Sequence, residues 1–246
     1  MKAYFLGTNG WYDTNTGNTV CTLLDTKDSY IIFDAGNGFY KIDRYIKTDK
    51  PINLFLSHFH LDHVSGLHIL AKFNFKQGLD IYGPAGLKRL FKEVINAPYS
   101  MPIKQLKMPV RLHEVNSRSL LPAGIEYKPL KHSSVCYGYR VEKEGKTVAY
   151  CTDTGVCRNL LSLACAADLL IAECSFKQGQ KNLAWPHLNP ESAGKIAKDA
   201  KAKKLVLVHF DAEIYRDLAQ RKQAAQLARK FFREAIFGYD NLQLKI

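Results

Sequence analysis

The segment 58–63, with the sequence HFHLDH, constrains this chain more than any other because it places three imidazoles and a carboxylate in one short stretch. Imidazole and carboxylate groups are side chains that bind zinc and related divalent metal ions. An apolar run at 52–56 lies directly before the segment and has the length of a buried strand. The sequence therefore predicts a metal site just after a strand, with further ligands supplied from elsewhere in the chain.

Short apolar runs alternate with turns and with segments of helical periodicity along the whole chain. No repeat or linker divides it, so we expect one α/β domain over residues 1–246. Residues 97–122 carry four prolines and are expected to be mostly loop. Helices are expected at 39–46, 66–73, 85–95, 190–201 and 212–235. Strands are expected at 2–6, 19–24, 30–33, 52–56, 80–82, 110–115, 125–130, 135–142, 147–151, 168–172 and 204–208.

The composition is that of a globular protein, with 46% apolar and 24% charged residues. A net charge of +12 favours an anionic partner such as nucleic acid, a nucleotide or a phosphorylated metabolite, although a basic surface without a partner explains it equally well. The six cysteines form no Cys-x-x-Cys pair and are expected to be reduced. Because no signal peptide and no membrane-spanning apolar run is present, we expect a soluble, cytoplasmic protein without membrane contact.

Three further candidate ligands follow strand-like runs: His132, Asp153 and His209. Each alone would be an ordinary turn or hydrogen-bonded residue. Together with segment 58–63 they favour a centre of two divalent cations. Such a pair, roughly 3.5–4 Å apart, lowers the pKa of a shared water toward about 7 and suits hydrolysis. Imidazole ligands make zinc the default metal, with manganese or iron as alternatives.

The order of these residues resembles the metallo-β-lactamase superfamily over nearly the whole chain. The resemblance implies a four-layer αββα sandwich of the metallo-β-lactamase type. It also implies that Asp153 bridges two cations, and a bridging aspartate rather than a cysteine points to the phosphodiesterase branch more than to the lactam-cleaving one. The ligands implied for one cation are His58, His60 and His132, and those for the other are Asp62, His63 and His209.

Four shorter stretches resemble the ribonuclease Z group of that superfamily: residues 7–10, 173–176, 185–188 and 209–210. This resemblance implies a homodimer and a catalytic pair formed by Glu173 and His187. The chemistry suits the pair, because a carboxylate that orients an imidazolium helps it to donate a proton to a leaving oxygen. The ordinary alternatives are an exposed strand-end acid and a capping or packing histidine.

One departure from that group concerns the arm that grips tRNA. In this chain only 21 residues separate His132 from Asp153, where the group inserts its arm, so no arm fits there. Residues 97–122 could supply another lid, made basic by Lys104, Lys107, Arg111 and Arg118, although a solvated loop is commoner. Processing of tRNA 3′ ends is therefore placed in doubt.

The leading hypothesis is a metal-dependent phosphodiesterase that acts on RNA or on a small cyclic phosphodiester. The first alternative is a metallo-hydrolase of carboxylic esters, thioesters or lactams, because an activated water also attacks carbonyl carbon. The second, from another class, is a non-catalytic nucleic-acid-binding protein, which would usually have lost ligands. Lysines between 195 and 204 could bind an anion, but such a run is more often a solvated face.

Overall fold

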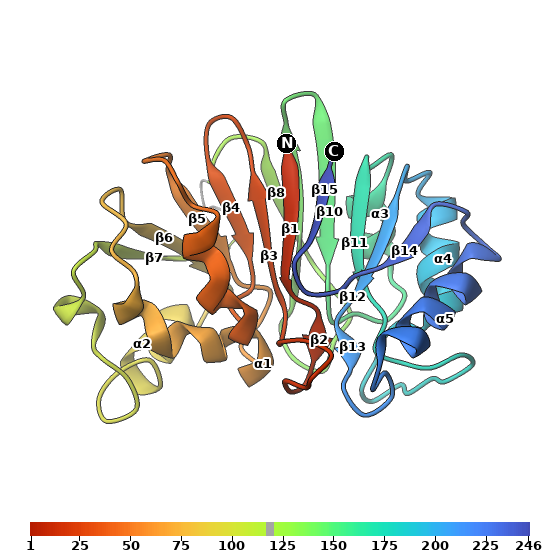
Figure 1. Ribbon diagram of the computed structural model, residues 1–246, viewed down its shortest axis with the longest axis horizontal. Coiled ribbons are helices and arrows are strands. Elements are labelled where there is room, and N and C mark those ends of the chain that lie inside the picture. Colours follow the sequence, from red (N-terminus) through yellow and green to blue (C-terminus); the bar gives the residue numbers. More distant parts are fainter. Residues whose placement is uncertain (117–120) are drawn as a thin grey trace.

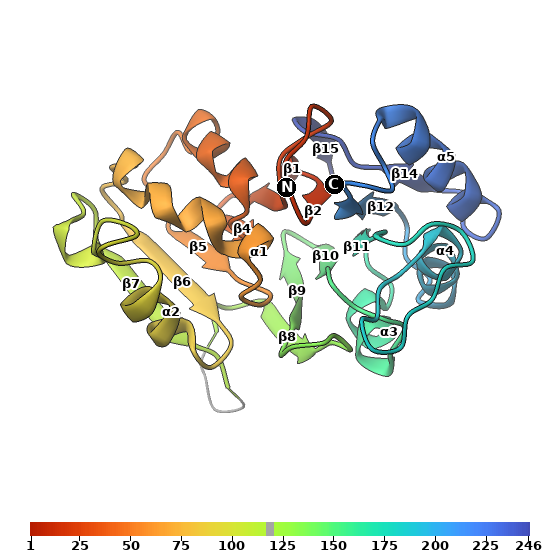
Figure 2. The ribbon, with the colours of Figure 1, turned by 90° about the horizontal axis from the view of Figure 1, so that it is seen from below.

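Two β-sheets lie face to face, and helices cover the outer face of each (Figure 1, Figure 2). The computed structural model describes residues 1–116 and 121–246. The layers follow the order helix, sheet, sheet, helix, with an apolar cluster at each of the three boundaries between layers. The four-layer αββα arrangement expected from the sequence is confirmed.

The first sheet has seven strands in the order β15-β1-β3-β4-β5-β6-β7. Strands β4 to β7 run parallel to one another, whereas β15, β1, β3 and β4 pair antiparallel. The strands are β1 (Lys2–Gly7), β3 (Cys21–Asp25), β4 (Tyr30–Phe33), β5 (Ile52–Phe55), β6 (Leu79–Gly83), β7 (Val110–Glu114) and β15 (Leu242–Lys245).

The second sheet has six strands in the order β14-β12-β11-β10-β9-β8. Strands β10, β11, β12 and β14 are parallel, and β8 and β9 are antiparallel to their neighbours. The strands are β8 (Ile125–Pro129), β9 (Tyr137–Lys143), β10 (Lys146–Cys151), β11 (Leu169–Glu173), β12 (Leu205–Val208) and β14 (Ala235–Phe237). A short parallel pair, β2 (Asn9–Gly10) with β13 (Phe210–Asp211), joins the two halves of the chain.

Helices on the outer face of the first sheet are mostly short. They are the 3-10 helices η1 (Asn37–Arg44), η2 (Ser65–Lys72) and η3 (Ile103–Gln105) with α1 (Leu61–Val64) and α2 (Leu87–Glu93). The second sheet is covered by α3 (Arg158–Ala164), α4 (Pro190–Asp199) and α5 (Leu218–Arg229). Asn189 and Asp217 begin α4 and α5 with side-chain caps, because each accepts a hydrogen bond from the third residue of its helix.

Side chains alternate between two apolar environments along the buried strands. In β4, Tyr30 and Ile32 pack under the helices, whereas Ile31 and Phe33 face the second sheet. Phe33 stacks on Tyr150 of β10, with ring centroids 4.6 Å apart. Since both faces of the sheet are covered, every residue of β4 is buried, and the strand is a continuous apolar run in the sequence.

Most predicted elements are present, but several boundaries differ. The segments expected as helices at 39–46 and 66–73 are 3-10 rather than α-helical. The helix expected at 212–235 was too long, because the cap at Asp217 delays its start to Leu218 and the chain enters β14 at Ala235. Helix α3 and strand β15 were not predicted. Within 97–122, the expected strand is β7, and Arg118 lies outside the described residues.

The interval between His132 and Asp153 is occupied by the β9–β10 hairpin, which turns at Glu144 and Gly145. Its tip points away from the edge that carries α1 and β13 (Figure 1). The expectation that no arm is inserted here is confirmed. Among the residues that the structure describes, no helix is both long enough and apolar enough to cross a membrane.

Candidate metal centre

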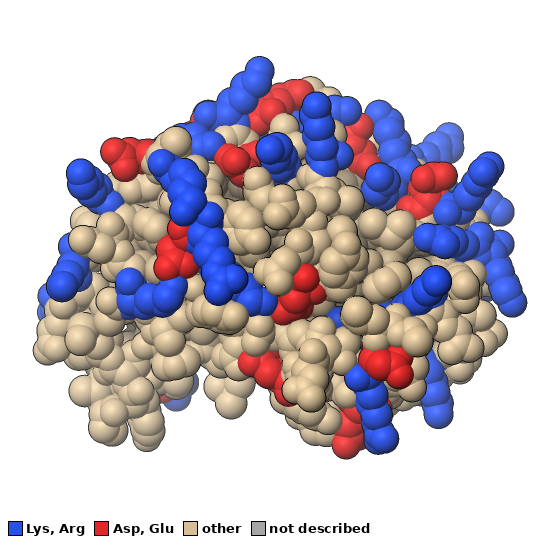
Figure 3. Space-filling view, in the orientation of Figure 1, with Lys and Arg blue, Asp and Glu red and all other residues tan. Residues whose placement is uncertain are grey.

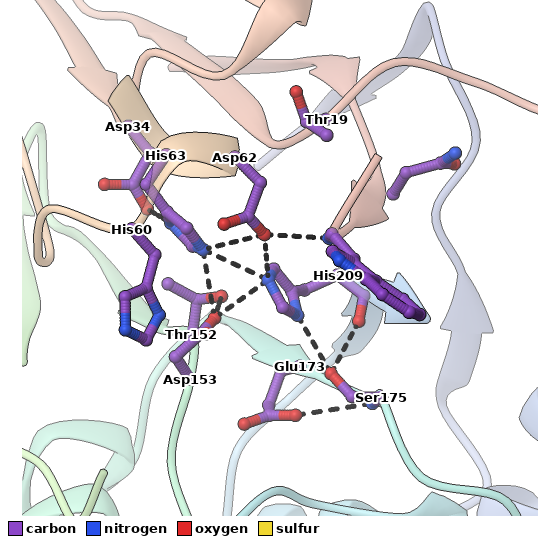
Figure 4. A network of polar contacts seen from close by, with 12 residues as sticks. Thr19, Asp34, His60, Asp62, His63, Thr152, Asp153, Glu173, Ser175 and His209 are labelled. Carbon is purple, nitrogen blue, oxygen red and sulfur yellow. Dashed lines mark hydrogen bonds and ion pairs between the residues drawn. The ribbon is translucent and has the colours of Figure 1, made fainter. Parts of the chain in front are cut away.

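The carboxyl ends of strands from both sheets meet at one edge of the sandwich (Figure 2). Segment 58–63 follows β5 of the first sheet at this edge. Asp153 and His209 follow β10 and β12 of the second sheet, and Glu173 ends β11 (Figure 4). Carboxyl ends of parallel strands are a common place for functional side chains, because the loops that follow them are free to vary.

All seven predicted metal ligands lie together at this edge. Their nitrogen and oxygen atoms form two groups, in each of which the ligand atoms lie within 4.8 Å of one another. The first group contains His58, His60, His132 and Asp153, and the second contains Asp62, His63 and His209. This division is the same as the one that the family resemblance implied.

Asp153 lies between the two groups and turns one oxygen toward each. Its Oδ1 lies 3.0 Å from Nε2 of His209 and 3.3 Å from Nε2 of His63. Its Oδ2 lies 3.6 Å from Nε2 of His58 and 3.7 Å from Nε2 of His132. A carboxylate in this position can bind two cations at once.

The first group fits a metal ion in its protonation as well as its geometry. Nε2 of His58 is buried and has no hydrogen-bond partner, although an unpaired buried polar atom is unfavourable. Burial lowers the pKa of His58 well below its ordinary value, and burial likewise lowers the pKa of His60 and His132. These imidazoles are therefore neutral, as metal ligands must be.

The second group has a different electrostatic balance. Burial lowers the pKa of His63 and of His209, but the carboxylates led by Asp153 outweigh burial and raise both. For Asp62, burial raises the pKa, but His63 and His209 outweigh burial and hold it below the ordinary value. A bound cation would take the place of the protons on the two histidines, because it satisfies the same carboxylates.

Supporting residues hold the ligand rings in place. Asp34, at the end of β4, accepts hydrogen bonds from Nδ1 of His63 at 2.9 Å, from the backbone N–H of Ser57 at 2.7 Å and from the hydroxyl of Tyr150 at 2.7 Å. Ser175 places its hydroxyl 2.9 Å from Nδ1 of His209 (Figure 4). Fixing Nδ1 in this way leaves Nε2 of each ring directed at the centre.

Sequence reasoning missed these supporting residues. In the sequence, Asp34 is a single aspartate that follows the strand expected at 30–33, and Ser175 and Tyr150 carried no metal-ligand signal of their own. The one available signal is positional, because Asp34 follows a buried strand parallel to the strand that precedes segment 58–63. Asp34 is fully buried, which no isolated sequence pattern predicts for an aspartate.

The predicted pair of Glu173 and His187 is formed beside the ligand cluster. Nδ1 of His187 lies 2.8 Å from Oε1 and 3.0 Å from Oε2 of Glu173. Glu173 is fully buried and also accepts a hydrogen bond from the backbone N–H of Thr154. Burial lowers the pKa of His187, but the carboxylate of Glu173 outweighs burial and raises it to about 9. His187 is therefore protonated at neutral pH in the metal-free protein.

A cavity of about 670 Å³ opens over the cluster and is lined by ligand residues, His187 and several aromatic side chains. Gly10 of β2 lines it where the chain passes close to His209. A Cβ atom at Gly10 would lie 2.6 Å from Cε1 of the His209 ring, so only glycine leaves room for that ring.

A family model described as "Beta-lactamase superfamily domain" matches residues 29–210, which is most of the chain. The chain belongs to the metallo-β-lactamase superfamily. The matched span includes segment 58–63, His132, Asp153 and His209. The family resemblance drawn from the ligand order is therefore confirmed.

This metallo-β-lactamase superfamily protein is related to ribonuclease Z along most of its length. It is 27% identical to ribonuclease Z of Synechocystis, with 85% of this chain and 83% of the relative covered. Among solved structures, the metallo-β-lactamase fold protein YhfI from Bacillus subtilis matches with a TM-score of 0.82 and 24% identity over 99% of this chain and 98% of that chain. The short form of human tRNase Z matches with a TM-score of 0.75 and 22% identity over 100% and 99% of the two chains.

Proposed function

We propose that this superfamily member is a phosphodiesterase that uses two divalent cations, with zinc as the resident metal. The observation that carries the proposal is the contact between Glu173 and His187 beside the ligand cluster. Hydrolysis of a phosphodiester that releases an alkoxide needs a proton at the departing oxygen, and this pair can supply it. The ribonuclease Z name of the curated relatives supports a phosphodiester substrate, either RNA or a smaller ester.

The proposed ligands divide as the geometry groups them. His58, His60 and His132 would hold one cation, and Asp62, His63 and His209 the other, with Asp153 shared between them. When bound, such a pair supplies an activated water and Lewis-acid stabilisation of the phosphoryl oxygens. Asp34 and Ser175 orient the imidazoles of the second group.

His187 is the proposed general acid. Its Nδ1–H donates to Glu173, which leaves the opposite nitrogen available to protonate the leaving oxygen of a substrate in the cavity. Glu173 favours the charged form of the ring before that transfer, because its carboxylate raises the pKa of His187. After the transfer, Glu173 still holds the neutral ring in the same orientation for the next proton.

The test begins with metal analysis of the purified protein. The zinc-loaded protein is then offered bis(p-nitrophenyl) phosphate, cyclic nucleotides, a precursor tRNA, p-nitrophenyl acetate and a lactam panel. We expect about two cations per chain and turnover of a phosphodiester. Asp153→Asn should abolish turnover and lower the metal content. His68→Ala is the matched control, because His68 is an exposed histidine outside the cluster.

Turnover of the lactams or the acetate without any phosphodiester would overturn the proposal in favour of the carbonyl-hydrolase alternative. Binding of RNA with no turnover of any ester would favour the non-catalytic alternative. The homodimer implied by the family resemblance stays a prediction, which analytical ultracentrifugation measures directly.

A further inference from the structure

Aromatic side chains form part of the wall of the cavity over the ligand cluster. Trp11, Tyr12, Phe176 and Trp185 all line it. The chain has two tryptophans in total, so both of them lie at this one site. Trp11 and Trp185 are also strongly exposed, at 61% and 47%, although large aromatic side chains are usually buried in a core. Exposed indoles over a cavity are a feature that the fold itself does not require.

Each tryptophan is held in place through a predicted metal ligand. The Trp185 ring lies flat against the His60 ring, with centroids 5.4 Å apart and an interplanar angle of 5°. Trp11 has a left-handed backbone with φ 71°, which is unfavourable for a bulky residue. Its backbone N–H donates to Oδ2 of Asp62 at 2.8 Å, and this hydrogen bond secures the unusual conformation. Trp185 is therefore positioned beside the ligand cluster through its ring, and Trp11 through its backbone.

The charge of the cavity limits what its aromatic walls can bind. Although the net charge is +12, the described residues that line the cavity include no lysine and no arginine. They do include Asp211 as well as Asp62 and Asp153. A second phosphate on the substrate would find no lysine or arginine among these side chains. A flat, uncharged ring would instead gain stacking contact with the indoles.

We propose that Trp11 and Trp185 bind a flat aromatic group, such as a nucleobase, carried by the non-leaving side of a phosphodiester with one negative charge. The inference rests on the proposed function and adds a substrate class to it. In this arrangement the indoles hold the aromatic group while the phosphorus lies over the ligand cluster. The two tryptophans are thus specificity-determining residues, not catalytic ones.

The kinetic test uses three diesters with the same leaving group and the same charge: methyl, cyclohexyl and phenyl p-nitrophenyl phosphate. Cyclohexyl and phenyl groups are similar in size, but only phenyl is flat. We expect the zinc-loaded protein to favour the phenyl ester over the cyclohexyl ester by about tenfold in kcat/KM. Trp185→Leu and Trp11→Leu should each lower this ratio severalfold, whereas Trp185→Phe should retain most of it.

A binding test gives a readout that does not depend on turnover. Diphenylphosphinate and dimethylphosphinate carry the same anion and have no ester bond to cleave. Since both tryptophans line the cavity, diphenylphosphinate should change the intrinsic tryptophan fluorescence at concentrations at which dimethylphosphinate does not. The same titration of Trp11→Phe and of Trp185→Phe shows which indole gives the fluorescence change, because each variant retains only one tryptophan.

The outcomes separate this inference from the proposed function. Hydrolysis with the same phenyl-to-cyclohexyl ratio in the native protein and both leucine variants would overturn the aromatic site and leave the phosphodiesterase standing. Equal fluorescence responses to the two phosphinates would also overturn it. Absence of hydrolysis of every diester would overturn the proposed function, and a response to diphenylphosphinate alone would then still support an aromatic binding site.

Discussion

Three residues of the candidate centre share an unusual backbone conformation. Asp34, Asp153 and His209 have φ values of 56°, 51° and 51°, in the left-handed region. Each comes just after a strand, where a left-handed residue turns the chain sharply. Such a residue costs about 1–2 kcal/mol relative to the right-handed region. In each case the left-handed conformation directs the side chain into the candidate centre. Unfavourable backbone conformations of this kind are typical of functional sites.

The first prediction concerns His187→Gln. The variant keeps a polar side chain but cannot protonate a leaving oxygen, so kcat should fall by about 10²–10⁴ for diesters with alkoxide leaving groups. The loss should be much smaller with p-nitrophenolate, which departs without protonation. The measurement compares kcat for the two leaving groups.

Metal content is the control for this variant. Because Nδ1 or Nε2 of His187 also lies near ligand atoms of Asp153 and His209, the histidine could itself be a ligand. His187→Gln should retain both cations if it is the acid. A variant that loses a cation, with equal losses for both leaving groups, would contradict the role as acid.

The second prediction concerns Gly10→Ala. The new Cβ would lie 2.6 Å from the ring of His209, so the ring must turn out of the second ligand group. We expect the bound zinc to fall from about two ions per chain toward one, with a matching loss of turnover. Gly83→Ala is the control, because its Cβ would meet its nearest neighbours at an ordinary 3.5 Å. Equal zinc contents in the two variants would show that the ring adapts.

The residues of the site differ in how far the sequence could reveal them. Segment 58–63 and the later strand-end residues were accessible because metal ligands combine a rare residue type with a position after a strand. Asp34 and Ser175 were not, because a single aspartate or serine after a strand is normally a turn residue. Asp34 and Ser175 act through hydrogen bonds to the rings of His63 and His209, which lie far from them in the sequence.

At the scale of elements, helix α5 is fixed to the site by one buried cation. Arg221 is fully buried and hydrogen-bonds through its guanidinium to Thr8 and Asn9 of the loop that contains β2. The same guanidinium lies 4.9 Å from the ring centroid of Phe210 in β13. Helix α5 therefore supports the loop whose Gly10 contacts His209. In the sequence, Arg221 is one of several basic residues within the helix expected at 212–235, and nothing there marks it as buried.

The third prediction concerns Arg221→Leu. The leucine fills apolar space but leaves the buried Thr8 and Asn9 side chains without these hydrogen bonds, so the free energy of unfolding should fall by about 2–4 kcal/mol. Urea unfolding followed by circular dichroism measures the change. Lys222→Leu, one position along and exposed, should change the free energy by less than about 0.5 kcal/mol. A similar unfolding midpoint for both variants would contradict the supporting role.

Helix lengths illustrate why element boundaries were harder to predict than element types. The apolar positions around 212–217 continue the pattern of α5, so the expected helix extended across the true start. The capping hydrogen bonds of Asp217 with Gln220 end that pattern locally. Strands such as β4 were predicted almost to the residue, because full burial makes them continuous apolar runs bounded by polar turns.

At the scale of the whole molecule, the basic charge and the reacting centre lie in different places. Lysines and arginines spread over the top and the sides of the face shown in Figure 3. The described residues that line the cavity contribute none. The net charge that suggested an anionic partner therefore acts outside the cavity, on anything long enough to extend beyond it.

The fourth prediction concerns salt. For a small diester, kcat/KM should change by less than about twofold between about 50 and 500 mM NaCl, because the described residues that line the cavity include no lysine or arginine. For a single-stranded RNA that extends over the basic surface, kcat/KM should fall by about tenfold or more over the same range of NaCl. Rates for both substrates are measured in the same buffers. A steep salt dependence for the small diester would place basic residues at the cavity.

The ligands of the candidate metal centre come from both halves of the chain, which bears on when a cation can bind during synthesis. Segment 58–63 emerges early in synthesis, but its partners His132, Asp153 and His209 belong to the second half of the chain. The early histidines and aspartate alone offer a cation an incomplete coordination shell. A cation held by the growing chain would therefore gain the remaining ligands of the centre only after β12 has docked, so complete metal loading is expected late in folding.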